Sequence, residues 1–136
     1  MALDLGEKRI GVAVCDATRT IAKAYGVLGR KSRQEDFQRY ADIIIQEEVT
    51  LLVMGLPVPL SGVEGQRAAW VRDYTAELAR YIDVPIEFWD ESFSTKQAQA
   101  SLRARGKRGK KVKERVDAVA AAFILQNYLD AHAQSS

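Results

Sequence analysis

The chain has 136 residues, of which 47% are hydrophobic and 28% are charged, so we expect one globular domain over residues 1–136 with a sizeable core. No apolar run approaches the ~18 residues of a membrane span, and the first residues alternate where a signal peptide would be continuously apolar, so we expect a cytoplasmic protein with no membrane partner. One cysteine and one histidine exclude an internal disulfide and a structural zinc site, and they argue against serine–histidine catalysis.

Three antiparallel strands are predicted at the start of the chain. Apolar residues recur at every second position in residues 2–5 and 9–16, which a short turn joins, and residues 20–28 form the third strand. Asp4 interrupts the first strand with a charge. A buried carboxylate needs a partner, so Asp4 either has one or lies at an exposed strand end.

Helices and strands then alternate. Ser32 and Glu35 form a capping box for a helix that ends near Glu48. Its inner side is predicted to carry Phe37, Tyr40, Ala41, Ile44 and Ile45. The apolar run LLVMG at 51–55 predicts a strand covered on both faces.

The second half of the chain continues this alternation. A helix is expected near 64–82, with Val71, Thr75, Leu78 and Ile82 at helical spacing, and PIEFW at 85–89 is the fifth strand. Ser94 and Gln97 predict another capped helix to about Ala104, and the last helix is expected from about Glu114 to Ala131. This order predicts an α/β fold with a mixed sheet and helices on both faces.

The positive charge of the chain is concentrated in one segment. Residues 103–115 (RARGKRGKKVKER) hold eight of the twenty Lys and Arg residues and one of the eighteen Asp and Glu residues, a local charge of +7, and the rest of the chain carries −5. We interpret the segment as a mobile loop that contacts nucleic-acid phosphates, although a merely solvated loop is the alternative. The candidate contact residues in it are Lys107, Arg108, Lys110 and Lys111, joined by Lys8 and Arg9 in the first turn.

Further acidic residues stand where a ligand of such a sheet would bind. Asp90 and Glu91 follow the fifth strand, and Asp117 shares a helical face with Ala121, Ile124 and Tyr128. Each has a simpler interpretation, such as an exposed strand end or a favourable charge at a helix N-terminus. Converging carboxylates repel unless a cation lies among them, and hard oxygen ligands favour Mg²⁺ or Mn²⁺. Acids with a basic segment therefore make a metal-dependent nuclease a physical hypothesis.

Four stretches carry a resemblance to a known family. ALDLGEKRIGVAVCD, VMGLP, DESFST followed by Ala98, and RVDAVAAAFILQNYL resemble, in order and nearly end to end, the motifs of the bacterial YqgF (RuvX) family. The resemblance implies a ribonuclease H-like fold, with a five-stranded mixed sheet of three antiparallel and then two parallel strands, and a metal-dependent acidic site. Members are described as Holliday junction resolvases and as nucleases that mature the 5′ end of 16S ribosomal RNA.

By this resemblance Asp4 is the acid that would bridge Mg²⁺ or Mn²⁺ ions, Glu91 is the second acid and Asp117 is the acid of the last helix, while Asp90 is an alternative second acid. The chain departs from the family pattern DERLST at Ser92, which replaces an arginine and puts one phosphate or carboxylate contact in doubt. It also has Ser61 and Gly62 after Gly55-Leu56-Pro57, where the family usually has Asp-Gly.

Several functions remain open at this stage. The preferred one is processing of precursor 16S ribosomal RNA by a monomer or weak homodimer, and the alternative is a Holliday junction resolvase acting on branched DNA, which needs two active sites in a twofold dimer. A nucleic-acid-binding module without catalysis is a third possibility. The D-x-G at residues 4–6 is also typical of actin-like and Hsp70-like ATPases, but those proteins enclose ATP between two such domains and this chain supplies one.

Overall fold

The helices and strands follow one another in the predicted order. The computed structural model describes residues 1–57, 65–91 and 110–133, with the backbone alone for residues 110–117. Its elements are β1 (Ala2–Leu5), β2 (Arg9–Cys15), β3 (Ala22–Gly29), α1 (Arg33–Gln46), β4 (Leu52–Leu56), α2 (Gln66–Ala79), β5 (Ile86–Asp90) and α4 (Lys110–His132).

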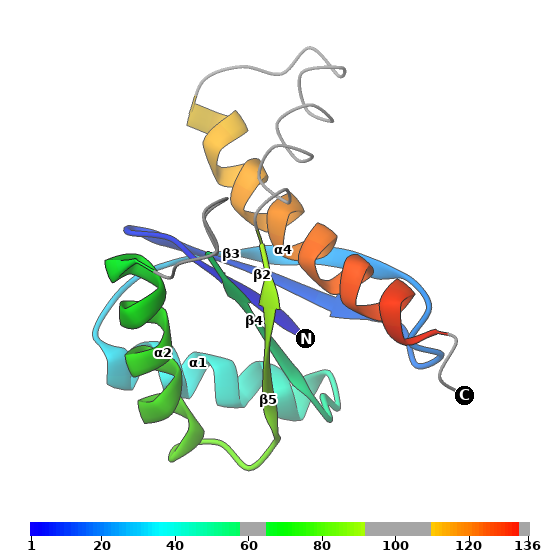
Figure 1. Cartoon of the computed structure of the whole chain (residues 1–136), viewed down its shortest axis with the longest axis horizontal. Helices are drawn as coiled ribbons and strands as arrows, with labels where there is room; N and C mark the ends of the chain where they lie inside the picture. Colours follow the sequence, from blue (N-terminus) through cyan, green and yellow to red (C-terminus); the bar gives the residue numbers. More distant parts are fainter. Residues whose placement is uncertain (58–64, 92–109, 134–136) are drawn as a thin grey trace.

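The strands form one mixed sheet in the order β3-β2-β1-β4-β5 (Figure 1). β2 pairs antiparallel with β1 and β3, whereas β4 pairs parallel with β1 and β5. The prediction of three antiparallel and two parallel strands is therefore confirmed. The carboxyl ends of β1, β4 and β5 consequently lie at the same edge of the sheet, which is where parallel strands place ligands.

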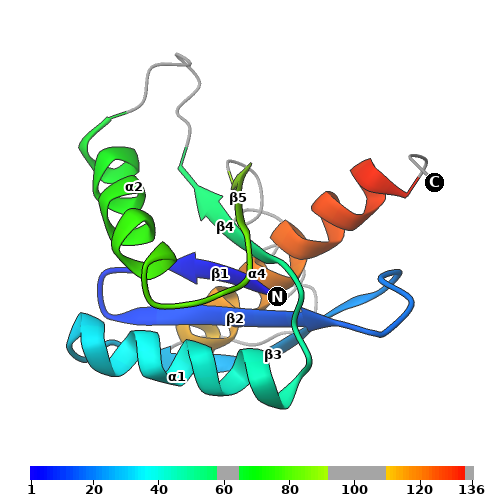
Figure 2. The same cartoon turned by 90° about the horizontal axis from the view of Figure 1, so that it is seen from below.

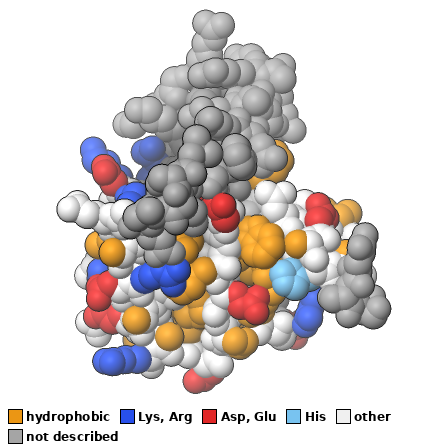
Figure 3. Space-filling model, in the orientation of Figure 1, with side chains coloured by type: hydrophobic (Ala, Val, Ile, Leu, Met, Phe, Trp, Pro, Cys, Tyr) orange, Lys and Arg blue, Asp and Glu red, His pale blue; other side chains and the backbone are white. Residues whose placement is uncertain are grey.

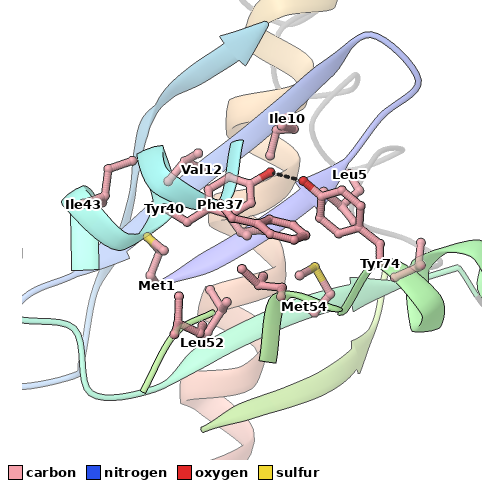
Figure 4. Packing of buried hydrophobic residues seen from close by; sticks show 14 of the residues in the cluster. Met1, Leu5, Ile10, Val12, Phe37, Tyr40, Ile43, Leu52, Met54 and Tyr74 are labelled. Atoms are coloured by element: carbon pink, nitrogen blue, oxygen red, sulfur yellow. Dashed lines mark hydrogen bonds between the residues drawn. The ribbon is translucent and has the colours of Figure 1, made fainter. Parts of the chain in front are cut away.

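The first face of the sheet packs against α1 and α2, which lie on the near side of the sheet in Figure 2 while α4 lies behind it. Large side chains fill this face, among them Leu3, Ile10, Val12, Phe37, Tyr40, Leu52, Met54, Tyr74 and Leu78. The hydroxyls of Tyr40 and Tyr74 are 2.8 Å apart and join the two helices by a buried hydrogen bond (Figure 4). Burial raises the pKa of Tyr74 to about 12, so this pair stays neutral.

The second face packs against α4. Its buried residues are mostly smaller: Ala2, Ala13, Val53, Ala121, Ile124, Leu125 and Tyr128. Alanine at the contact lets a helix approach a sheet closely, and the helical face predicted for Ala121, Ile124 and Tyr128 is the buried one. None of the helices among residues 1–57, 65–91 and 110–133 is long and apolar enough to cross a membrane.

Three details correct or limit the predictions. Ile45 is 77% exposed rather than on the inner side of α1. Phe37, Tyr40 and Ile43 form the buried stripe, and Ile45, two residues after Ile43, lies on the opposite side of the helix. The last helix begins at Lys110 rather than Glu114, so residues 110–115 of the basic segment are helical, because Lys and Arg are good helix formers. The capped helix expected from Ser94 lies outside the described residues.

Candidate acidic site

Asp4 and Glu91 come together on the α4 face of the sheet. Asp4 is two residues after Ala2 in β1 and therefore lies on the same face of the sheet, where Ala2 packs under α4. Glu91 is likewise two residues after Trp89, which packs against the same cluster. The backbone amide of Glu91 donates to the Leu56 carbonyl at 3.1 Å, which fixes the residue one step beyond the end of β5. The two side chains form a hydrogen bond across the strand that separates them.

That separating strand is β4, and the residue between the two acids is Gly55. Register pairs Gly55 with Trp89, and Leu3 with Met54, so Gly55 is level with Asp4. A Cβ atom on Gly55 would lie 2.6 Å from Glu91 Oε2 and 2.8 Å from Ile124 Cδ1. Glycine is therefore required for the Glu91 carboxyl to pass over β4 beneath α4 and reach Asp4.

The Glu91 carboxyl is held in an unfavourable electrostatic environment. Burial, followed by the charge of Asp4 and the hydrogen bond to it, raises the pKa of Glu91 to about 9, while the charge of Arg67 opposes this rise. Glu91 Oε2 is buried and has no hydrogen-bond partner. Two carboxyl groups so close either share a proton or need a cation between them.

This arrangement fits a divalent cation. The buried, unpartnered Oε2 of Glu91 and the adjacent Asp4 carboxyl are hard oxygen donors of the kind that Mg²⁺ and Mn²⁺ prefer. Among the side chains that the structure describes, no three of Asp, Glu, His and Cys meet in one place. Other ligands would have to come from elsewhere in the chain, from water or from the substrate.

The structure places the two remaining predicted acids differently. Asp90 is exposed at the end of β5, and by the pleat of the strand it belongs to the face of Phe88, opposite Glu91. Its charge still contributes to the raised pKa of Glu91. Asp117 lies in α4 one turn before Ala121 and about 10 Å along the axis from Ile124. Its side chain is outside the described part of the molecule.

The predicted cationic residues lie on two sides of this edge. Lys8 is exposed in the β1–β2 turn, which is closed by a 2.8 Å hydrogen bond from the Gly6 amide to the Arg9 carbonyl, and Arg9 begins β2. Lys110 and Lys111 are in the first turn of α4, which lies beyond the carboxyl end of β5 in Figure 1. Lys107 and Arg108 are outside the described residues.

The single histidine, His132, is exposed and is the last residue of α4. The His132 ring stacks on Tyr128 with centroids 4.0 Å apart, and its Nδ1 is 2.7 Å from the Tyr128 carbonyl oxygen. Figure 3 shows it beside a group of apolar side chains. These contacts give His132 a place in the packing of α4, with no role in the acidic pair.

Two residues of the site were not singled out from the sequence. Gly55 carried a detectable signal, because a glycine inside an apolar strand indicates a close approach of another group. Arg67 carried none. Its Nη2 donates to the carbonyl of Leu5, the residue after Asp4. This contact depends on where the fold places α2 relative to β1.

The fold and the acidic pair define a ribonuclease H-like α/β protein with its carboxylates at the edge of a mixed sheet. The RuvC of Thermus thermophilus, solved in complex with a Holliday junction substrate, shares this fold with a TM-score of 0.58 at 15% identity, covering 98% of this chain and 94% of that one. The Fowlpox virus resolvase, solved with Holliday junction DNA, matches with a TM-score of 0.52 at 10% identity over 95% of both chains. The fold prediction is confirmed.

Residues 1–131 match the model of the family described as RuvX, Holliday junction resolvase, and the chain belongs to this family. Proteins named "Putative pre-16S rRNA nuclease" from Paramagnetospirillum magneticum and Thermoanaerobacter pseudethanolicus are 41% identical over 130 residues and 40% identical over 132 residues. The alignments cover 96% of this chain in both cases, and 84% and 94% of the relatives. The resemblance identified from the sequence motifs is thereby confirmed.

Proposed function

We propose that this chain is a cytoplasmic, divalent-metal-dependent nuclease that hydrolyses phosphodiester bonds in the 5′-end processing of precursor 16S ribosomal RNA. The observation that carries the proposal is the Asp4–Glu91 pair, with its buried, unpartnered carboxylate oxygen. Family membership and the names of the relatives support the reaction and the substrate.

Asp4, Glu91 and Asp117 would hold Mg²⁺ or Mn²⁺. When bound, such a cation activates water for attack on a phosphodiester and offsets the charge that develops on the phosphate. Glu91 has to release its proton to act as a ligand, and the positive charge of Arg67, which lowers the Glu91 pKa, favours that release. Gly55 keeps the space beneath α4 open for the Glu91 carboxyl. Asp90, on the opposite face of β5, is left out of this ligand set and acts on Glu91 only through its charge.

The cationic residues are proposed to hold the nucleic acid rather than to react. Lys8 lies in the β1–β2 turn that follows Asp4, Arg9 begins β2, and Lys110 and Lys111 open the helix that carries Asp117. Together with Lys107 and Arg108 they would place positive charge on both sides of the acidic pair. Such charges contribute sequence-independent affinity through phosphate contacts.

Asp117→Asn tests the catalytic assignment. The change keeps the shape of the side chain and removes a charged ligand, so cleavage is expected to fall at least about 100-fold, which corresponds to ~3 kcal/mol of barrier, while binding of nucleic acid survives. The matched control is Asp83→Asn, an exposed acid in the connection that leads into β5 at the opposite edge of the sheet. Cleavage by Asp117→Asn at the control rate would refute the three-acid site.

The substrate is decided by a paired assay. The purified protein with Mg²⁺ or Mn²⁺ is offered a precursor 16S fragment and a four-way DNA junction, and its sedimentation is measured under the same conditions. The proposal expects cleavage of the RNA by a monomer or weak dimer. The family description and the resolvases of like fold favour the second candidate, Holliday junction resolution. A stable dimer that cuts junctions symmetrically and leaves the RNA intact would establish that candidate instead, and binding without cleavage would indicate a non-catalytic module.

A further inference from the structure

An open, cationic depression lies next to the acidic pair, on the side away from α4. It has a volume of about 330 Å³ and is lined by Glu7, Arg30, Arg67 and Trp70. These residues come from the β1–β2 turn, the segment between β3 and α1, and the first turns of α2. We name it the Arg30–Arg67 pocket. It was not singled out from the sequence.

Arg67 connects this pocket to the acidic pair. Its side chain donates a hydrogen bond to the carbonyl of Leu5, which directly follows Asp4, and its charge acts on the Glu91 carboxyl. Arg67 is nevertheless an exposed residue, and it lines the open pocket. A group bound at Arg67 would therefore lie beside the place where the reaction is proposed to occur.

Arg30 is held in a fixed position on the other side of the pocket. Its Nη1 donates to the carbonyls of Gly6 at 3.2 Å and Glu7 at 2.9 Å, and its Cζ lies 4.6 Å from the centre of the Trp70 ring. Its Nε is buried and has no hydrogen-bond partner. A guanidinium that is already oriented loses little entropy when it binds an anion, and its planar donors match the oxygens of a phosphate.

The same contacts decide which part of a nucleic acid fits. Arg30 lies over the Trp70 ring, Arg33 lies 5.8 Å from its centre, and the ring also packs against Tyr74 at 5.3 Å, so these neighbours compete with a base for the indole faces. The groups that remain for a ligand are guanidinium donors, partly offset by the carboxylate of Glu7. This chemistry favours an anionic phosphate over a base.

We propose that the Arg30–Arg67 pocket binds a backbone phosphate of the substrate strand adjacent to the bond that is cleaved. The proposal rests on the proposed nuclease function and names a contact that this function did not include. The pocket positions the strand over the acidic pair, and Arg67 is a positioning residue in it.

The test measures how the affinity for RNA oligonucleotides depends on salt, in the Asp117→Asn background so that cleavage does not interfere. Arg67→Gln removes one donor of the pocket, and the matched control Arg80→Gln removes the same charge from an exposed position at the other end of α2. For Arg67→Gln, the slope of log affinity against log salt is expected to fall by about 0.7 on single strands or about 0.9 on duplexes, with roughly fivefold weaker binding. Arg80→Gln is expected to keep the slope of the background protein.

Two further variants keep the proposal testable if Arg67→Gln does not fold. Arg67→Lys and Arg30→Lys preserve the charge and lose the planar fork, so they should keep the salt slope and still bind more weakly than the background protein. Equal slopes for Arg67→Gln and Arg80→Gln, or equal losses in both, would overturn the pocket. Affinities of both lysine variants equal to that of the background protein would also overturn it.

The outcome also separates this proposal from the proposed function. A wild-type chain that cleaves RNA while Arg67→Gln keeps its salt slope would refute the pocket alone. A wild-type chain that binds RNA without cleaving it would refute the nuclease function, and the slope would still decide the phosphate contact. Failure of the wild type to bind nucleic acid would overturn both.

Discussion

The two faces of the sheet are built on different principles. The face beneath α1 and α2 is filled by large apolar side chains, and its buried hydroxyls, Tyr40 and Tyr74, satisfy each other. The face beneath α4 combines alanines and a glycine with a buried carboxyl group that lacks one hydrogen-bond partner. The difference indicates that the first face supplies stability, whereas the second gives up some stability to keep a site for charge.

Substitutions in the first face should therefore lower the stability of the fold without changing the rate of cleavage. Leu78 is fully buried in α2, so Leu78→Ala is expected to lower the free energy of unfolding by about 3 kcal/mol in urea titrations. The rate of cleavage per folded molecule should not change. Ile45→Ala, at a position that is 77% exposed, is the control and should stay within about 0.5 kcal/mol of the wild type. A small effect at Leu78 would remove the contrast between the faces.

The second face should respond in activity to a change of a single methyl group. Gly55→Ala places a Cβ against Glu91 Oε2 and Ile124 Cδ1, so the carboxyl must move away from Asp4 or α4 must shift. We expect cleavage to fall about tenfold or more and stability to fall by about 1–3 kcal/mol. Gly26→Ala in β3 is the matched control, since a Cβ there meets nothing within 4 Å. Equal activity of the two variants would show that Gly55 does not shape the site.

The cost of the acidic pair should appear as a pH dependence of stability. The folded pKa of Glu91, about 9, lies above the ordinary value of 4.5, so the folded protein holds a proton that the unfolded chain releases. The stability that this proton contributes is fully present below pH 4.5 and is lost as the pH rises toward and through 9. Without metal, Glu91→Gln should therefore be more stable than the wild type by about 2 kcal/mol at pH 8 to 9, and the difference should shrink toward pH 5. The measurement is urea unfolding at several pH values with Asp83→Asn as control, and a difference that does not change with pH would contradict the burial of the Glu91 charge.

The contrast between the faces also separates what the sequence can predict from what it cannot. The alternation in β1 and β2, the fully apolar β4 and the helical stripe at Val71, Thr75 and Leu78 each predicted an element, because local period determines which residues are buried. The prediction that Ile45 lies on the inner side of α1 was wrong, because a run of three isoleucines obscures which of them face the core. The start of α4 was misplaced because a charge run was interpreted as a loop although Lys and Arg favour helices.

Of the candidate site, the sequence predicted the acidic residues but not the contacts between them. Asp4 was noticeable as a charge inside a strand, and Glu91 as an acid that follows one. Their contact depends on β4 lying between β1 and β5 and on Gly55 facing α4, which are properties of the register rather than of any single segment. The contact of Arg67 with the Leu5 carbonyl depends in the same way on the placement of α2. Long-range geometry of this kind leaves no local pattern in the sequence.

In the proposed metal site, Asp4 and Glu91 hold a proton that the metal displaces when it binds. Calorimetric titration of Mn²⁺ at pH 7.5, in two buffers with different ionisation enthalpies, measures the number of protons released on binding. We expect the wild type to release about one proton, and Glu91→Gln to bind the metal more weakly without such release. Binding by the wild type without proton release, or equal affinity in Glu91→Gln, would contradict this expectation.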